Sequence, residues 1–350
     1  MKVFKYILIL LIVFLISGYF LLQNHSVQNR LFENTVRELF QTDEIFMNDA
    51  LSVAVCGSRA PLPSPNRAET CLLVQAGTSK FIIDTGRGSA DNLQRWRVDY
   101  SDLEAVILSH LHSDHISDLH EVQFQSWLGG RKTPLSVIGP IGTASTAQGF
   151  EQAFKLDSIY RSEHHGAILP IEAYGYDVVE FEGDAKLIFE NEDTRITAFK
   201  VDHAPVDPAY AFKIEYKDRS IVVSGDTVSL DVMTEYSKGV DVLFHDALAK
   251  PLIQEMEKIS EEIGNNIVSK VLFDIQDYHA NTVEVADIAR RAEVDLLVFY
   301  HLIPAPRNYI SEQMFLRGVD EIFTNYHVSE DGTLVSLPAG SDEILIDLID

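Results

Sequence analysis

Cysteine is scarce in this chain of 350 residues, which contains only Cys56 and Cys71. Two isolated cysteines form no CxxC pair, so a zinc site built from cysteines is excluded. If the protein is exported, the two residues could form a disulfide that closes a short loop. The alternative is a pair of small, partly buried residues in neighbouring strands. Sequence does not decide between the two, because it shows no geometry.

Basic residues are also few, since 28 Lys and Arg stand against 53 Asp and Glu and give a formal net charge of −25. Such a chain repels phosphate backbones at long range, which leaves room for a small basic patch but not for a broad nucleic-acid-binding surface. We therefore expect that the partner is not a nucleic acid. The apolar fraction of 46% is ordinary for a globular protein with a sizeable core.

Charged residues are absent from Tyr6 to Leu22, a run of 17 residues that follows Lys2 and Lys5. The run is just long enough to cross a bilayer, and neither an A-x-A-like cleavage site nor a cysteine for lipid attachment follows it. We interpret residues 1–22 as an uncleaved signal anchor, a transmembrane helix whose N-terminal lysines stay in the cytoplasm. The catalytic domain would then lie outside the cytoplasm, on the periplasmic or extracellular side. A cleaved signal peptide predicts the same compartment, and a buried core helix is disfavoured.

The rest of the chain alternates strand-like and helix-like patterns. Residues 23–50 hold a polar linker, 23–34, and a short amphipathic helix, 35–50. From residue 51 to 341, short apolar runs alternate with helical patterns in two similar halves, which indicates one layered α/β domain. Strands are expected at 51–57, 69–77, 80–86, 103–109, 194–203, 210–227, 241–247, 295–301 and 332–340, and helices at 91–98, 116–130, 251–264 and 282–294. An acidic tail, 342–350, has no assigned role.

A histidine motif follows the strand expected at 103–109, with His110 and His112 two positions apart and then Asp114 and His115. Alternate residues of an extended segment project to the same side, so the first two histidines can hold one ion together. Asp114 and His115 come where the chain turns into the next helix and can face a second ion. Imidazole and carboxylate ligands suit zinc, with manganese or iron as alternatives.

Three more ligand-type residues stand at the ends of apolar strands: His203 after ITAFKV, Asp226 after SIVVSG and His301 after DLLVFY. Strand ends are where sites form in layered α/β domains. A lone histidine at a strand end is more often structural, but three such ends beside the motif favour ligands.

These segments resemble the metallo-β-lactamase superfamily in the motifs HLHSDH, VDHAP, SGDT and YHL, and most of all its ribonuclease Z and arylsulfatase-like branch. The resemblance covers about residues 51–340 and implies a four-layer αββα sandwich. It implies His110, His112 and His203 on one metal, Asp114, His115 and His301 on the other, and Asp226 as the bridge. The histidine at 112, where flavodiiron relatives have glutamate, favours zinc hydrolysis over redox chemistry. Asp226, where most zinc lactamases have cysteine, argues against a lactamase.

Further residues are expected around the metals. The resemblance implies that His279 donates a proton to the leaving group, while Asp114 orients the attacking hydroxide. Asp84 and the pair His245 and Asp246 are expected to support the metal-bound imidazoles, because carboxylates commonly hold the far nitrogen of such rings. Asp84 could equally be a turn residue before Gly86. The resemblance also implies substrate contact by Asn66 and Arg67. His164 and His165 could line the substrate pocket or lie in a solvated loop.

The resulting prediction is a membrane-anchored hydrolase with two zinc ions, which cleaves a small-molecule phosphodiester or sulfate ester through a metal-bound hydroxide. The alternative is a ribonuclease Z-type tRNA 3′-processing endonuclease. The net charge, the N-terminal segment and the missing Gly- and Lys-rich arm between His115 and His203 argue against it. A third hypothesis, a membrane-tethered binding protein without catalysis, would require lost ligands, and all seven are present. A homodimer is left open.

Overall fold

The computed structural model describes residues 2–41 and 44–349, and the chain divides into two compact units, residues 1–43 and 44–350. The first unit contains α1 (Lys2–Leu22) and α2 (His25–Leu39). Residues Phe4–Leu22 of α1 have a mean hydropathy of 2.4 and none of them is buried. By length and composition this helix is a candidate membrane span, as the apolar run predicts.

Helix α2 differs from the predicted linker, because residues 25–34 are helical while the described residues between Phe40 and Asp49 form no helix. The Asn24 side chain caps the helix by accepting hydrogen bonds from the backbone N–H groups of Ser26 and Val27. Four positions apart, Glu33 and Arg37 form an ion pair of 2.7 Å on its surface. These local contacts favour a helix where composition alone suggested a linker.

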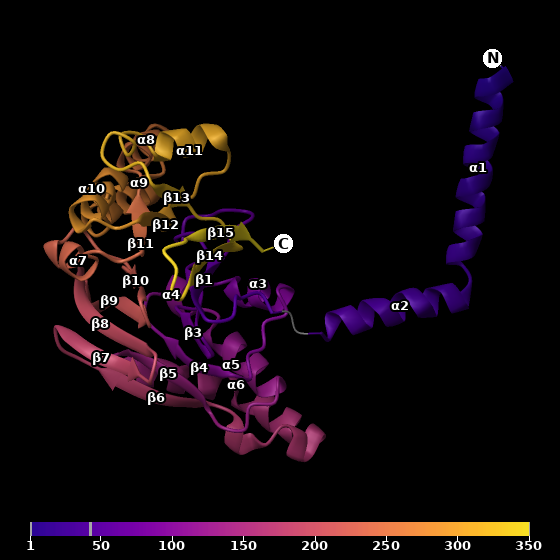
Figure 1. Ribbon diagram of the computed structural model, residues 1–350, viewed down its shortest axis with the longest axis horizontal. Helices are drawn as coiled ribbons and strands as arrows, with labels where there is room; N and C mark the ends of the chain where they lie inside the picture. The colour runs from indigo at the N-terminus through magenta and orange to yellow at the C-terminus, as the bar shows by residue number, and fades with distance from the viewer. Residues whose placement is uncertain (1, 42–43, 350) are drawn as a thin grey trace. The chain divides into compact units, whose positions relative to one another are not determined.

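The second unit contains two sheets that face each other (Figure 1). The larger sheet has the order β15-β14-β1-β2-β3-β4-β5-β6, and the smaller has the order β13-β12-β11-β10-β9-β8-β7. The strands of the larger sheet are β1 (Ala50–Gly57), β2 (Cys71–Ala76), β3 (Ser79–Ile83), β4 (Leu103–Ile107), β5 (Leu135–Pro140), β6 (Tyr176–Phe181), β14 (Thr333–Pro338) and β15 (Leu345–Leu348). Those of the smaller are β7 (Ala185–Glu190), β8 (Thr194–His203), β9 (Val206–Tyr216), β10 (Arg219–Val223), β11 (Val242–Leu248), β12 (Leu296–Ile303) and β13 (Tyr326–Val328).

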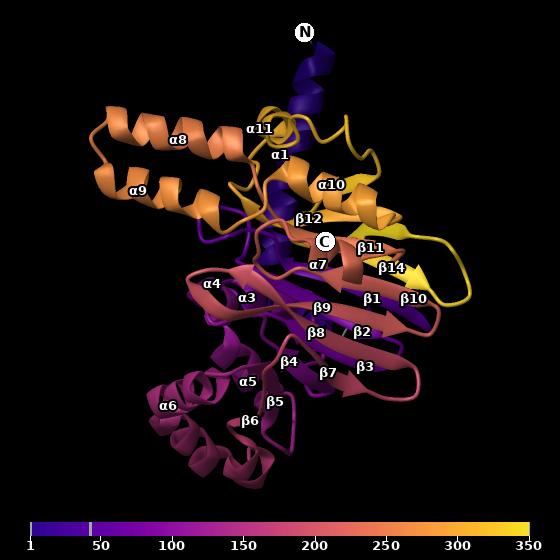
Figure 2. The same ribbon diagram turned by 90° about the vertical axis from the view of Figure 1, so that its left-hand side faces the viewer.

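Helices cover the outer faces of the sheets (Figure 2). The helices are α3 (Ser89–Arg95), α4 (Ser113–Ile116), α5 (Leu119–Leu128), α6 (Thr143–His165), α7 (Asp231–Tyr236), α8 (Lys250–Glu262), α9 (Asn266–Asp274), α10 (Thr282–Ala292) and α11 (Tyr309–Phe315). One buried apolar cluster fills the space between the sheets. A second packs α3 and α5 on the larger sheet, and a third packs α7, α10 and α11 on the smaller. Two sheets with helices outside each confirm the predicted four-layer αββα sandwich.

The structure extends the second unit beyond the range expected for the layered domain from the sequence. Residues 345–348, inside the predicted tail, form β15 and pair with β14 at the edge of the larger sheet. The structure also resolves the question of the two cysteines, because Cys56 of β1 and Cys71 of β2 form a disulfide with their Cα atoms 4.9 Å apart. The disulfide therefore joins two neighbouring strands inside the core.

Candidate metal centre

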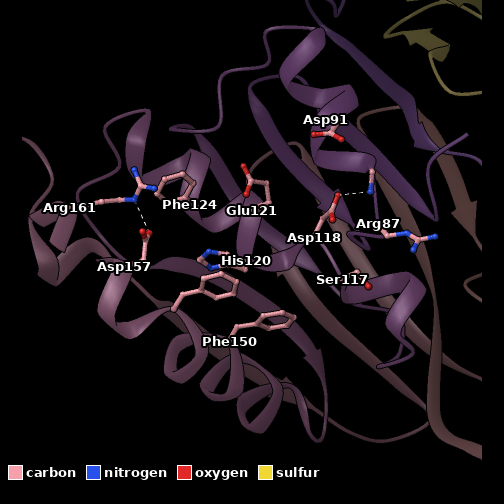
Figure 3. A pocket seen from close by; sticks show the side chains of 12 residues that line it. Arg87, Asp91, Ser117, Asp118, His120, Glu121, Phe124, Phe150, Asp157 and Arg161 are labelled. Carbon is pink, nitrogen blue, oxygen red and sulfur yellow. Dashed lines mark hydrogen bonds and ion pairs between the residues drawn. The ribbon is translucent and has the colours of Figure 1, made fainter. Parts of the chain in front are cut away.

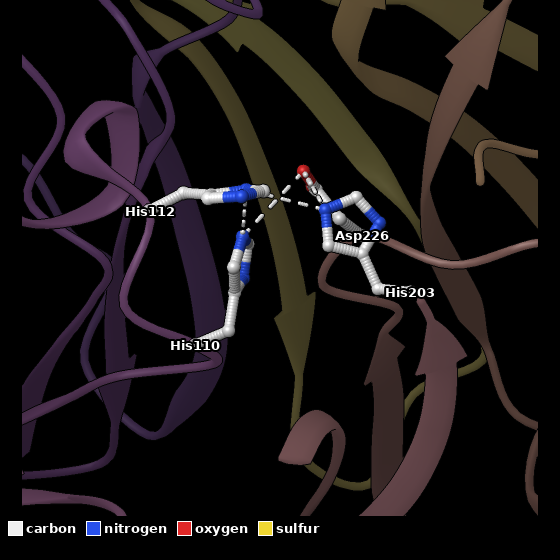
Figure 4. Close-up of side chains that lie close together, drawn as sticks. All are labelled: His110, His112, His203 and Asp226. Atoms are coloured by element: carbon white, nitrogen blue, oxygen red, sulfur yellow. Dashed lines mark hydrogen bonds and ion pairs between the residues drawn. The ribbon is translucent and has the colours of Figure 1, made fainter. Parts of the chain in front are cut away.

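Seven buried or partly buried side chains gather where strands of both sheets end. His110 and His112 follow β4, and Figure 4 shows them pointing toward His203, at the end of β8, and Asp226, after β10. The metal-binding atoms of these four side chains all lie within 4.8 Å of one another. A second group with the same spacing comprises Asp114, His115, Asp226 and His301. The structure therefore brings all seven expected ligand residues together in two groups.

Asp226 is the member common to both groups and is only 2% exposed. Its Oδ2 atom lies 3.8 Å from His110 Nε2 and 3.7 Å from His203 Nε2. It also lies 3.3 Å from His115 Nε2 and 3.2 Å from His301 Nε2. Its Oδ1 atom is buried and has no hydrogen-bond partner among the described residues. A carboxylate with this placement fits a bridge between two cations, since a buried unpaired oxygen is otherwise costly.

The backbone places the metal-facing side chains at the ends of the strands. Strands β10, β11 and β12 run parallel, so their carboxyl ends meet at one edge of the smaller sheet. His112 is the N-cap of the short helix α4, which turns Asp114 and His115 into the site. His301 has a φ of 45° and Asp84 a φ of 58°, a region that residues other than glycine rarely adopt. Strained backbone of this kind is found at functional sites, where the surrounding packing holds it.

The groups of the cluster titrate outside their usual ranges because they are buried together. Burial, followed by the charge of His115, lowers the pKa of His110 well below its ordinary value. Burial alone would raise the pKa of Asp114, but His115 and His301 outweigh it and bring the pKa to about 2. Burial alone would lower the pKa of His115, but the charge of Asp226 outweighs burial and leaves the pKa well above its ordinary value. The ionised carboxylates thus attract positive charge into this cluster, which is what a bound cation would supply.

Neighbouring groups hold the second nitrogen of several imidazoles. Asp84 Oδ2 lies 2.8 Å from His115 Nδ1, and its two oxygens also accept hydrogen bonds from the Ser109 backbone and hydroxyl. The Ser109 hydroxyl lies 3.1 Å from His110 Nδ1. Ser109 was not foreseen, although it directly precedes the motif. Asp84 combines the two roles weighed for it, since it supports an imidazole from a turn with positive φ.

Asp246 takes a different place from the expected one, because it contacts His279 and not a metal-facing imidazole. The Asp246 Oδ2 atom lies 2.9 Å from His279 Nδ1. His245 Nδ1 lies 2.8 Å from the Asp246 carbonyl oxygen and 3.0 Å from its carboxylate. Asp246 and His279 also form a third group of possible ligand atoms with Asp226 and His301, within 4.8 Å. His279 therefore stands at the edge of the cluster with one nitrogen fixed by a buried carboxylate.

Asn66 and Arg67 line a cavity of about 500 Å³ next to the strand that carries His301. Arg67 Nη1 donates hydrogen bonds to the Ser58 hydroxyl at 2.8 Å and the Ser329 carbonyl at 2.6 Å, which holds the loop in place. Three more arginines line the same cavity, namely Arg59, Arg87 and Arg95. Sequence patterns did not reveal this group, because its members come from separate segments.

His164 and His165 do not join the site. They form the last turn of α6, both rings are exposed, and they contact each other with ring centroids 4.8 Å apart. Neither belongs to any of the described cavities or metal-binding groups. The expectation that they line the substrate pocket is therefore not met, because α6 continues for 23 residues and carries them away on its exposed end.

Comparison with known proteins finds a family model, a relative and two solved structures that are similar to this chain. Residues 65–301 match the family model described as the metallo-beta-lactamase superfamily. Ribonuclease Z of Mycobacterium bovis (strain BCG / Pasteur 1173P2) is 35% identical over 261 residues, which cover 73% of this chain and 87% of the relative. Among solved structures, the metallo-beta-lactamase fold protein YhfI from Bacillus subtilis has a TM-score of 0.60 at 21% identity, covering 82% of this chain and all of its own. Human tRNase Z, short form (ELAC1), has a TM-score of 0.59 at 18% identity, covering 82% and 99%.

The names of these relatives correct one prediction from the sequence. A small-molecule ester was expected as the substrate and a nucleic acid was not, yet the relative that is 35% identical is a ribonuclease. The prediction was wrong because it relied on the net charge of −25, which disfavours a broad binding surface but leaves room for a small basic patch, and four arginines gather at one cavity. Local charge, and not the total, decides contacts at short range, since screening removes distant charges.

The match to the family model and the identity to relatives agree with the two-sheet fold and its histidine cluster. The chain therefore belongs to the metallo-beta-lactamase superfamily and is a metal-dependent hydrolase of ester bonds.

Proposed function

We propose that this protein is a ribonuclease of the ribonuclease Z type, which hydrolyses phosphodiester bonds in RNA. The main support for this proposal is that all seven metal-facing residues lie together in this chain. The chain is also 35% identical to a ribonuclease Z over 73% of the chain's own length. A phosphodiester is an ester, so this substrate is consistent with the hydrolase family to which the chain belongs.

We further propose that the seven residues hold two zinc ions. His110, His112 and His203 would hold one, Asp114, His115 and His301 the other, and Asp226 both. Imidazole nitrogens and carboxylate oxygens are zinc ligands, and the buried, unpartnered Oδ1 of Asp226 fits a bridging role. Two bound cations would activate water for attack and polarise the phosphoryl oxygens.

Two side chains would handle protons in this reaction. Asp114, whose pKa of about 2 keeps it ionised, can accept a hydrogen bond from the attacking water and so orient it. As an imidazolium, His279 can donate a proton to the leaving oxygen from Nε2, while the Asp246 carboxylate 2.9 Å from Nδ1 holds the ring in place. Asp246 would act through His279 and is a positioning residue.

The arginine cavity supports RNA as the substrate class. Four arginines and two aspartates line it, in a chain that has nearly twice as many acidic as basic residues. Arg59 is buried and pairs with Glu69 at 3.0 Å, and the Arg87 side chain, which pairs with the same Glu69 at 3.2 Å, is 68% exposed. Exposed guanidinium groups beside the metal-facing residues are suited to contact phosphate groups of a strand.

We also propose that α1 anchors the chain in a membrane with the catalytic unit outside the cytoplasm. The apolar helix over Phe4–Leu22 supports anchoring, and the disulfide between Cys56 and Cys71 is typical of oxidising compartments. RNA outside the cytoplasm would then be the substrate pool. Protease treatment of spheroplasts, whose outer surface exposes periplasmic and extracellular domains alike, and of lysed cells tests this placement. Digestion of the catalytic unit in spheroplasts is expected, and full protection until lysis would contradict the proposal.

The ribonuclease proposal is tested with the full chain in detergent, loaded with zinc. Labelled precursor tRNA and a single-stranded RNA are the test substrates, and bis(p-nitrophenyl) phosphate reports hydrolysis without any RNA. Cleavage of at least one RNA is expected, together with its complete loss in His110→Ala. His164→Ala, which changes an exposed histidine on α6, is the matched control and should cleave like the wild type. Hydrolysis of the small phosphodiester without cleavage of either RNA would contradict the proposal.

A further inference from the structure

A second cavity, of about 740 Å³, lies between α3, α5 and α6 and plays no part in the metal centre (Figure 3). Ser117 and Asp118, which line it, follow the expected ligand His115 by two and three residues. Three residues of chain span at most about 11 Å, so the cavity begins close to the cluster. The cavity therefore lies near the turn that carries Asp114 and His115.

Aromatic side chains form one wall of this cavity. The ring of Phe154 lies parallel to that of His120, with centroids 3.3 Å apart and planes 6° apart. The ring of Phe124 follows at 6.1 Å from His120, with the planes 24° apart. Phe150 also lines the cavity, and Phe154 is 36% exposed although it is a large apolar residue. An open aromatic wall of this kind is suited to stack a planar ring.

Two polar groups on the cavity have no partner. His120 is 9% exposed, and its Nδ1 atom makes no hydrogen bond to any described residue. A buried polar atom without a partner is uncommon and indicates a missing ligand or water. The carboxylate of Asp91 also lines the cavity, and the described residues give it neither a hydrogen bond nor an ion pair. The His120 Nδ1 atom is itself buried, whereas the Asp91 side chain is exposed and free to contact an occupant.

The other charged groups of the cavity already have partners. Asp118 accepts hydrogen bonds from the backbone N–H groups of Gly88 and Ala90, at 2.8 and 3.1 Å. Arg161 pairs with Asp157 at 2.8 Å and covers the Phe124 ring at 4.5 Å. The cavity thus has more carboxylates than free cations, which disfavours a phosphate inside it. The expected occupant is a neutral, planar group that donates N–H to a carboxylate.

A nucleobase meets this description, and guanine meets it best. Guanine presents two neighbouring N–H donors, at N1 and N2, and one ionised carboxylate can accept both. Uracil presents a single N–H donor between two carbonyl oxygens, and these oxygens repel a carboxylate. The exposed Arg87, together with Gly88 and Asp91, lines both this cavity and the arginine cavity. A strand that passes Arg87 could therefore place a phosphate on the arginine side and a base on the aromatic side.

We propose that this aromatic cavity is a base-binding subsite, which stacks a guanine of the RNA near the scissile phosphate and holds its edge through Asp91. This subsite rests on the proposed ribonuclease function. Bases that are stacked on aromatic side chains and hydrogen-bonded at their edges are a general mode of recognition of single-stranded RNA.

Binding of free nucleosides to the full chain in detergent tests the subsite directly, because guanosine and uridine carry no phosphate for the metals. Saturation-transfer NMR and calorimetry should show guanosine binding at least about fivefold tighter than uridine. Phe154→Ala should weaken guanosine binding at least about fivefold, the loss expected when one stacking contact is removed. Asp91→Asn should abolish the preference for guanosine over uridine. Phe273→Ala, which removes an exposed ring from α9, is the matched control and should bind guanosine like the wild type.

Kinetics separate this inference from the function on which it rests. Phe154→Ala should lower kcat/KM for RNA at least about fivefold more than kcat/KM for bis(p-nitrophenyl) phosphate. If RNA is cleaved but Phe154→Ala changes both substrates equally, or guanosine binds no better than uridine, the subsite is overturned and the ribonuclease proposal stands. If guanosine binds but no RNA is cleaved, the ribonuclease proposal is overturned, and with it the assignment of the cavity to RNA.

Discussion

Single residues hold the metal-facing rings of this protein in one orientation. His110, His115 and His203 each have the second ring nitrogen within hydrogen-bond distance of an oxygen. The oxygens belong to a hydroxyl, a carboxylate and a backbone carbonyl. Each contact favours a proton on Nδ1 and a free electron pair on Nε2, the atom that points to Asp226. The imidazoles are therefore already oriented to bind a cation before one is present.

The Asp84 carboxylate is the strongest of these supports. In Asp84→Asn the anion beside His115 is replaced by a neutral amide of the same size, which no longer favours the proton on Nδ1. We expect a fall of about 10- to 100-fold in zinc affinity or activity, measured by competition with a chelator. Glu192→Gln, in an exposed turn, should leave the affinity unchanged. Equal zinc affinity in Asp84→Asn and the wild type would show that the contact has no role in metal binding.

The contact between Asp246 and His279 should affect the rate of catalysis and not the binding of zinc. Asp246→Asn leaves the size of the side chain unchanged but removes the anion that fixes the imidazole. We expect kcat to fall about 100- to 10,000-fold, the contribution of a positioned proton donor, while the zinc content measured by atomic spectroscopy stays the same. A fall in kcat that merely follows a loss of zinc would contradict the assigned positioning role.

At the scale of elements, the turn after β3 and the turn that carries Asp114 are in close contact. A Cβ atom added to Gly86 would lie 2.3 Å from the Asp114 carbonyl oxygen and 2.5 Å from the Glu69 carbonyl carbon. Both neighbours are backbone atoms, which cannot move without shifting their segments. Gly86 is therefore required for space and not for an unusual φ.

Gly86→Ala should consequently destabilise the protein by about 1 to 3 kcal/mol, as overpacking of a core does, and weaken zinc binding by displacing Asp114. Urea unfolding and zinc titration measure the two effects. Gly149→Ala is the matched control, because an added Cβ there meets nothing within 4 Å in α6. Wild-type stability and zinc affinity in Gly86→Ala would refute the close approach of the two turns.

The disulfide joins β1 and β2 across a separation of 15 residues. Closing a loop of this length stabilises a protein by about 3 kcal/mol, mainly by restricting the unfolded chain. Urea unfolding of the wild type should therefore shift to lower urea when a reductant is added. The double variant Cys56→Ala and Cys71→Ala should unfold at the same urea concentration with and without reductant. An unshifted wild type would mean that no disulfide is present.

The sequence predicted many elements of the catalytic unit where buried strands are short apolar runs between clear turns, but none of the elements from β5 to β7. The four-layer fold was confirmed, and the seven residues expected to bind metal lie together. Helix α2 was not predicted over its observed range, since it depends on a cap and an ion pair more than on apolar periodicity. The strand β15 was not recognised because its four residues, Leu-Ile-Asp-Leu, form only a short run among acidic neighbours at a sheet edge.

The remaining features depend on contacts between distant segments and have no local pattern. The arginine cavity combines residues 59–68 with Arg87, Arg95 and Asp331, which no sequence window contains together. The aromatic cavity likewise combines α3, α5 and α6. Asp246 contacts His279 only because β11 and the segment before α10 meet at the edge of the smaller sheet. The residue types of the site could thus be predicted from the sequence, but the contacts between distant residues could not.

The net charge of the whole molecule, −25, opposes the RNA binding that the proposed ribonuclease function requires. A uniformly acidic surface would repel RNA, so binding has to depend on the few exposed cations near the metal-facing residues, such as Arg87. The total charge therefore limits the strength of RNA binding but does not exclude it.

The proposed zinc-dependent cleavage of RNA can be measured as the rate of precursor tRNA cleavage by the metal-free full chain while zinc is added. We expect no cleavage without metal and a rate that rises until two zinc ions are bound per chain. Absence of RNA cleavage at every zinc loading, in a preparation that hydrolyses bis(p-nitrophenyl) phosphate, would contradict the ribonuclease proposal.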